Sequence, residues 1–290
     1  MNRGHSAHNV RSLLDLEAFA PIADNLRAVS EKLLRSSTVS ILIPPSITGV
    51  VASAILEAAM LDAGVPYRRR FFPRKVSPPY IVISEKESSE KELTSPNNPI
   101  SMTLSPFFSV GLRGVDGEPH RGIISPVAQV AALAELLAPG GKRTRSLRPW
   151  LIAGNWWGDS IDQGYDPIYS CLRDHLREEG SIRIVPLPEV ESPDLSELDK
   201  LDKERELGTR ETWSELDAEG RAKALSTLII PQVISKKPST SRLEELTWHR
   251  IIITNSDNDL HSIMRDFSIK WDGSQSSSNQ LIESLISNSY

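Results

Sequence analysis

The turn after the first apolar segment is the place where this chain could first carry out chemistry. Residues 39–61 read VSILIPPSITGVVASAILEAAML, which predicts a buried strand, a short turn and a helix of small and aliphatic residues. The turn carries two hydroxyl groups, on Ser46 and Thr48, followed by Gly49. Hard divalent cations prefer charged oxygen ligands. The turn therefore predicts a site that cannot hold a metal as two carboxylates would.

Two further residues could act as metal ligands. Asp159 ends the apolar segment WLIAGNWWGD (150–159), where it could be a ligand or, in the interpretation we favour, the cap of a turn or helix. His120 lies in the glycine-rich segment 105–121, where a solvated loop histidine is the simpler interpretation. A two-metal hydrolytic centre needs several charged ligands around ions roughly 4 Å apart. The sequence therefore predicts no bound metal and no cofactor.

Two basic clusters could contact nucleic acid. The first is Arg68-Arg69-Arg70-Phe71-Phe72 with Arg74-Lys75, and the second is Lys142-Arg143-Thr144-Arg145 with Arg148. Basic side chains neutralise phosphates and aromatic rings stack on bases, but arginines on a strand can equally be a solvated edge that prevents strand addition. If both clusters lie on one face, they would form a groove that follows phosphates. The candidate DNA-contacting residues are Arg68, Arg69, Arg70, Arg74, Lys75, Lys142, Arg143 and Arg145.

Composition restricts the class of protein. The chain has 290 residues, 39% hydrophobic and 24% charged, with a formal net charge of −5, so the whole molecule does not attract nucleic acid electrostatically. Residues 189–219 carry a net charge of −8, which leaves +3 on the rest. A single cysteine, Cys171, excludes an internal disulfide framework. No apolar run is as long as a membrane span, and we expect a cytoplasmic protein associated with the nucleoid or chromatin.

The periodicity predicts an α/β fold with a mostly parallel sheet and helices on both faces. Residues 39–43, 80–84 and 251–254 are expected in that sheet, and residues 105–121 as a loop. Three regions are expected along the chain: a domain over 1–188, an acidic linker or exposed helices over 189–220, and a C-terminal α/β extension over 221–290. Strands are also expected over 65–72, 100–104 and 182–187, helices over 11–35, 50–63, 125–137, 166–179, 221–235 and 257–267, and flexible segments over 1–10 and 273–279.

Four segments together resemble the DHH-superfamily phosphoesterase domain, most closely the archaeal RecJ-like, GINS-associated proteins and the inactive DHH subunit of the CMG replicative helicase. The resemblance covers about residues 36–185. Ser46 and Thr48 stand where the family's Asp-x-Asp-Gly turn would carry its aspartates, and Ser84 stands where another metal-binding aspartate would follow a strand. The segment 101–119 resembles the one that supplies the family's histidines, with Ser105-Pro106-Phe107-Phe108 in place of ligands, and only Asp159 is retained.

The resemblance implies a catalytically inactive protein that acts by binding. Its implied role is a structural subunit of an archaeal replicative helicase assembly, with GINS-type proteins and the MCM helicase as partners and single-stranded DNA as a further ligand. Two alternatives stay open. One is an active metal-dependent phosphoesterase or single-strand exonuclease with rearranged ligands (Asp159, Asp116, His120), and the other is a stand-alone protein that binds single-stranded nucleic acid. No P-loop, dinucleotide-binding glycine motif, nucleophile elbow or zinc-protease motif is present.

Overall fold

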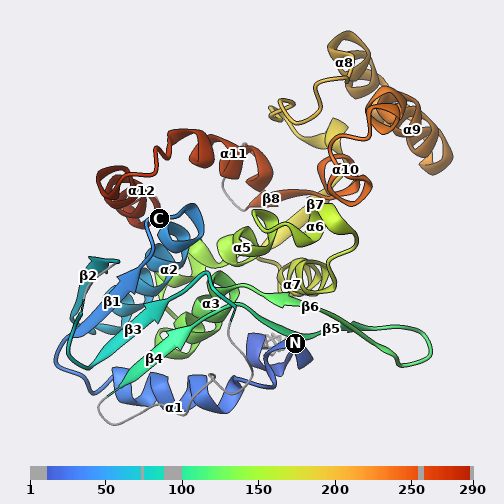
Figure 1. The fold of residues 1–290 in the computed structure, drawn as a ribbon. Helices are drawn as coiled ribbons and strands as arrows, with labels where there is room; N and C mark the ends of the chain where they lie inside the picture. Colours follow the sequence, from blue (N-terminus) through green and yellow to red (C-terminus); the bar gives the residue numbers. More distant parts are fainter. Residues whose placement is uncertain (1–11, 73–74, 88–99, 254–257, 288–290) are drawn as a thin grey trace, which may run out of the picture.

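A parallel sheet of four strands forms the centre of the structure, a computed structural model that describes residues 12–72, 75–87, 100–253 and 258–287. The strand order is β2-β1-β3-β4, every neighbouring pair is parallel, and helices flank the sheet (Figure 1). This confirms the predicted α/β fold class. The four strands are β1 (Val39–Ile43), β2 (Tyr67–Phe71), β3 (Tyr80–Ile83) and β4 (Ser101–Leu104).

Strand β1 has the residues and the bounds that the sequence predicted. It lies between β2 and β3, and four of its five residues are buried. A parallel strand covered on both faces needs a nearly continuous apolar run, which VSILI supplies. Strand β2 lies beside β1 at the edge of the sheet and carries the first basic cluster.

Helix α2 (Ile47–Ala63) follows β1 and begins three residues before the predicted position. The reason is the side chain of Ser46, which caps the helix by accepting a hydrogen bond from the Gly49 amide at 3.2 Å. Gly64 ends the helix at a left-handed φ of 69°, a conformation that glycine adopts without strain. Every residue from 49 to 60 is buried, because the sheet, α3, α4 and α12 all pack around this helix.

The other helices agree in large part with the predicted ranges. They are α1 (Ala23–Leu33), α3 (Pro126–Leu137), α4 (Lys142–Leu147), α5 (Ala153–Trp156), α6 (Ser160–Gln163), α7 (Pro167–Glu178), α8 (Lys203–Thr212), α9 (Ala218–Ser235), α10 (Thr240–Thr247), α11 (Leu260–Lys270) and α12 (Gln275–Ser287). Ser125 caps α3 and Pro126 occupies its first turn, as predicted. Helices α8 and α9 project from the rest of the molecule (Figure 1). None of the described helices is long and apolar enough to cross a membrane.

The segment 105–121, predicted as a loop, instead forms most of an antiparallel hairpin of β5 (Phe107–Arg113) and β6 (Pro119–Ile124). Buried and exposed residues alternate along the first half of β5, a period-2 pattern that the glycines and prolines obscured. Gly117 allows the turn at a φ of +81°. A Cβ at Gly111 would lie 2.5 Å from the Pro167 carbonyl carbon, so this glycine lets the hairpin contact α7.

The strand predicted over 251–254 does not join the parallel sheet. It is β8 (Arg250–Ile253), and it pairs antiparallel with β7 (Ile182–Val185) in a separate two-stranded sheet. A short apolar run predicts a strand but does not determine its partner, which explains the error. Residue 254 lies outside the described residues.

The segment 273–279, predicted as flexible, contains the start of helix α12. The hydroxyl of Ser274 accepts a hydrogen bond from the Ser277 amide at 3.0 Å, which caps this end of the helix. The apolar residues of α12 that follow pack against α2. Residues 1–10, predicted as a flexible terminus, lie outside the described residues, as do residues 88–99 between the predicted strands 80–84 and 100–104.

Candidate functional site

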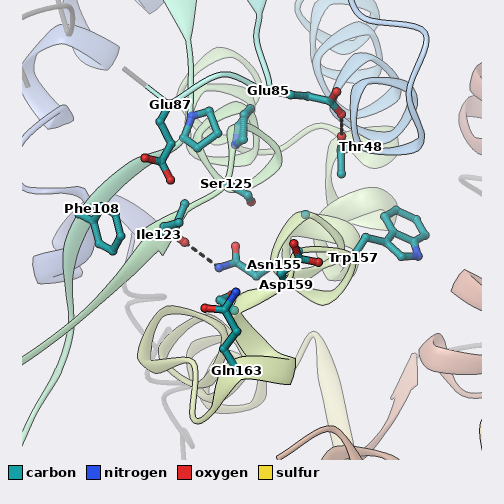
Figure 2. A pocket seen from close by; sticks show the side chains of 15 residues that line it. Thr48, Glu85, Glu87, Phe108, Ile123, Ser125, Asn155, Trp157, Asp159 and Gln163 are labelled. Atoms are coloured by element: carbon teal, nitrogen blue, oxygen red, sulfur yellow. Dashed lines mark hydrogen bonds between the residues drawn. The ribbon is translucent and has the colours of Figure 1, made fainter. Parts of the chain in front are cut away.

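Segments that follow three strands of the parallel sheet meet at a cleft of about 540 Å³ (Figure 2). Thr48 follows β1, Glu85 follows β3 and Pro106 follows β4. The base of the β5–β6 hairpin and the segment around α5 and α6 supply the remaining walls. The carboxyl ends of parallel strands are where open α/β sheets place their ligand sites, so this cleft is the candidate functional site.

The four positions that the resemblance aligns with metal ligands lie at or beside this cleft. Thr48 and Asp159 line it directly. The Ser46 hydroxyl lies 3.3 Å from the Thr48 hydroxyl. Ser84 immediately precedes the lining residue Glu85, and its hydroxyl accepts a hydrogen bond from the Lys86 amide at 3.2 Å. Segments far apart in the sequence are thus brought together as the resemblance implies.

The side chains present do not form a metal site. Glu85, Glu87 and Asp159 supply three carboxylates to the cleft. Within the described ranges, however, no three histidine, cysteine or acidic side chains are grouped so that they could hold a metal ion. The Glu85 carboxylate instead accepts a hydrogen bond of 2.5 Å from the Thr48 hydroxyl (Figure 2). The donor set therefore does not fit the two-metal centre of the phosphoesterases that the sequence resembles.

The rearranged ligand set proposed as an alternative is not assembled either. His120 lies on β6 opposite Leu112, and its Nε2 atom is 3.4 Å from a carboxylate oxygen of Glu118. Asp116 lies in the turn of the hairpin. Neither residue lines the cleft that contains Asp159. The interpretation of His120, Asp116 and Asp159 as a joint metal site is therefore wrong for this structure.

Of the two aspartates beside the cleft, Asp166 caps a helix and Asp159 does not. Asp159 precedes α6, but its exposed carboxylate makes no capping hydrogen bond. Asp166 caps α7, with its Oδ1 accepting bonds from the Ile168 amide at 2.9 Å and the Tyr169 amide at 3.0 Å. Its Oδ2 accepts a bond from Asn155 Nδ2 at 3.1 Å. The capping carboxylate is thus Asp166, and the Asp159 carboxylate is left to face the cleft.

Aromatic side chains from two segments border the cleft. Phe107 points into the core, whereas its neighbour Phe108 is 55% exposed and lines the cleft. Trp157 is half-buried and lines the cleft, and Trp150 and Trp156 are buried. Sequence reasoning placed Phe108 at the site but missed Glu85, Glu87 and Asn155. The one available signal was that Glu85 directly follows Ser84 at the end of a predicted strand.

The first basic cluster divides between the two faces of β2. Arg69 makes two bonds of 2.6 Å to the buried Glu57 carboxylate of α2 and one of 2.8 Å to Glu283 of α12. Burial alone would lower the pKa of Arg69, but these hydrogen bonds raise it, so the guanidinium stays charged. Arg69 is therefore already occupied by protein partners. Arg68 and Arg70 alternate with it along the strand and face away from α2.

The second basic cluster lies on the α2 side of the sheet. Helix α4 packs against α2, and Arg143 lies 3.1 Å from Asp62 of α2. Because Arg68 and Arg70 face away from α2, the two clusters do not form the common groove considered from the sequence. Lys75, Lys142 and Arg145 are exposed, and Arg74 lies outside the described residues. Contact with DNA stays a prediction for each of these residues.

Comparisons with known proteins found a likeness among solved structures. No protein-family model and no curated protein matches the sequence. Among solved structures, the chain aligns with the crystal structure of CDC45 from Entamoeba histolytica with a TM-score of 0.49 and 10% sequence identity. The alignment covers 94% of this chain and 68% of that chain. The assignment of a function therefore depends on the side chains of the cleft.

Proposed function

We propose that this chain is a non-hydrolytic relative of the DHH phosphoesterases that acts as a structural subunit of a replicative helicase assembly. Its direct partners would be GINS-type proteins, placed beside an MCM motor, with single-stranded DNA as a secondary ligand. It would act in the cytoplasm, associated with the nucleoid. Its mechanism is to hold subunits together by surface contacts.

One observation carries this proposal. Thr48 and Asp159 line a single cleft at the carboxyl ends of parallel strands, with Ser46 and Ser84 beside it. The folded chain thus supports the resemblance, while hydroxyl groups occupy three of the four positions where the resemblance expects carboxylates. A retained scaffold with altered ligands favours binding over hydrolysis.

The absence of hydrolysis is tested with purified protein, single-stranded DNA and manganese or magnesium. We expect no degradation beyond that of a mock preparation, because hydroxyls at Ser46, Thr48 and Ser84 do not replace charged metal ligands. Degradation that co-purifies with the protein and is abolished by Asp159→Ala would contradict the proposal. Asp116→Asn is the matched control, because Asp116 lies outside the cleft.

Partner binding is tested by affinity purification of the full chain from its native cells, followed by identification of the retained proteins. We expect GINS-type proteins in a stable complex with an apolar interface and a polar rim. Recovery of the chain alone, as a monomer by size, would contradict the proposal.

Helix α9 offers the first surface to substitute in that experiment. Ile230, Val233 and Ile234 are 51%, 51% and 74% exposed, and their i, i+3, i+4 spacing places them on one face of the helix. Ile234→Lys should reduce recovery of the partner if this face belongs to the interface. Ile269→Lys is the matched control, because Ile269 is 65% exposed on α11, a different helix.

A further inference from the structure

The charged side chains that line the cleft are all acidic. Glu85, Glu87 and Asp159 contribute carboxylates, and Asn155 contributes an amide oxygen. None of the fifteen lining residues that the structure describes is lysine, arginine or histidine. Such a lining repels phosphate and attracts a cation that donates several hydrogen bonds.

Asn155 provides a buried acceptor that has no donor among the described residues. The residue is only 3% exposed, and its Nδ2 donates to the Ile123 carbonyl at 2.7 Å and to Asp166 Oδ2 at 3.1 Å. Because both partners accept hydrogen bonds, the amide orientation is fixed. The Oδ1 atom has no hydrogen-bond partner among the described residues. Figure 2 shows the nitrogen directed at Ile123 and the oxygen turned into the space that the labelled side chains surround.

The apolar part of the cleft restricts the shape of the cation. Phe108 is 55% exposed and presents ring surface to the cleft, whereas the half-buried Trp157 ring stacks with Phe267 of α11 at 6.2 Å between centroids. A guanidinium group is planar, stacks on aromatic rings and offers five donors to carboxylate and amide oxygens. The volume of about 540 Å³ also exceeds what a single metal ion needs and falls within the range of organic ligand sites.

We propose that the cleft is a receptor for an arginine side chain presented by a protein partner, an inference that rests on the proposed binding function. The guanidinium would donate a hydrogen bond to Asn155 Oδ1, pair with the Asp159 carboxylate and lie against the ring of Phe108. A cleft in the position of a hydrolase active site would then serve to bind a side chain of a partner protein.

The experiment is a titration of the isotope-labelled full chain, monitored at the Asn155 side-chain amide and the Trp157 indole by nuclear magnetic resonance. The probes are acetyl-arginine methylamide and its uncharged isostere, acetyl-citrulline methylamide. We expect saturable shifts with the arginine probe and binding weaker by about tenfold with the citrulline probe. Asp159→Asn should weaken arginine binding by about tenfold without unfolding the protein, because its carboxylate makes no capping bond.

Asp116→Asn is the matched control and should leave arginine binding unchanged, since it removes the same charge outside the cleft. The inference is overturned if the arginine probe causes no shifts, if citrulline binds equally well, or if Asp159→Asn has no effect. Saturable broadening of the same resonances by manganese alone, lost in Asp159→Asn, would identify a metal site instead. The affinity purification separates this inference from the proposed function. If Asp159→Asn retains GINS-type proteins as well as the wild type does, the arginine contact is refuted and the proposed function stands. If the wild type retains no partner, the proposed function is refuted, and the titration alone decides whether the cleft binds arginine.

Discussion

Arg69 provides the sharpest test of the structure, because the sequence suggests a DNA contact and the fold suggests a structural ion pair. Its guanidinium makes two bonds of 2.6 Å to Glu57, a side chain with no exposed surface, and Ser53 donates a third bond of 2.6 Å to the same carboxylate. Arg69→Met would leave the Glu57 charge buried beside the hydroxyl groups of Ser53 and Tyr67, neither of which carries a positive charge. Removing one member of a buried pair costs about 3–5 kcal/mol.

The assay is urea unfolding followed by circular dichroism. With a slope of about 3 kcal/mol per molar urea, the midpoint of Arg69→Met should fall by about 1–2 M. Glu283→Gln breaks only the outer bond to Arg69, and because Glu283 is 66% exposed it should cost about 0–1 kcal/mol. The double variant Arg69→Met with Glu57→Leu should recover most of the loss, because an apolar pair leaves no charge buried.

The result that would refute this reasoning is a midpoint for Arg69→Met no lower than that of Glu283→Gln. The same variant also separates structure from DNA binding. Its affinity for single-stranded DNA, measured on the folded protein, should equal that of the wild type. A loss of affinity without a loss of stability would restore Arg69 as a phosphate contact.

Further predictions concern pH and salt. Burial raises the pKa of Glu179, but hydrogen bonds from His175 and other neighbours outweigh it and lower the pKa from its ordinary 4.5 to about 2. The carboxylate therefore stabilises the fold above pH 4.5 by at most about 3 kcal/mol, and this contribution is lost as the pH falls towards 2. Glu179→Gln should reduce the pH dependence of the free energy of unfolding between pH 4.5 and 2. The control Glu178→Gln, at an exposed residue, should leave that pH dependence unchanged, and an equal pH dependence in the two variants would contradict the prediction. Arg68→Glu and Arg145→Glu should each reduce, by about one, the slope of log binding constant against log salt concentration for single-stranded DNA. Both variants should still assemble with protein partners, and a loss of assembly would contradict a role limited to DNA binding.

Local signals determined much of the fold in advance. The apolar run of β1 and the Ser125-Pro126 start of α3 depend on residues close together in the chain, so periodicity and capping rules identified them. The cap of α2 by Ser46 shows the limit of this approach. The same hydroxyl was considered as a replaced metal ligand, and its bond to the Gly49 amide gives it a structural role as well.

Features that depend on contacts between distant segments could not be predicted. The choice of β7 as the partner of β8 depends on how the chain packs, and so does the contact of Gly111 with α7 that seats the hairpin. The positions that the resemblance aligns with metal ligands were identified from the sequence alone. The unpaired oxygen of Asn155 was not, because it becomes visible only once Ile123 and Asp166 have oriented the amide.

The burial of α2 has a consequence for the order in which the chain can fold. Residues 49–60 are covered partly by α12, more than two hundred residues later in the chain, and Arg69 is bonded to Asn279 and Glu283 of that helix. During synthesis the first strands and α2 therefore emerge with an apolar flank that stays open until α12 has left the ribosome. Contacts over such long sequence separations slow folding and prolong the exposure of apolar surface. The N-terminal half of this protein is accordingly the part that most needs protection by a chaperone while translation is under way.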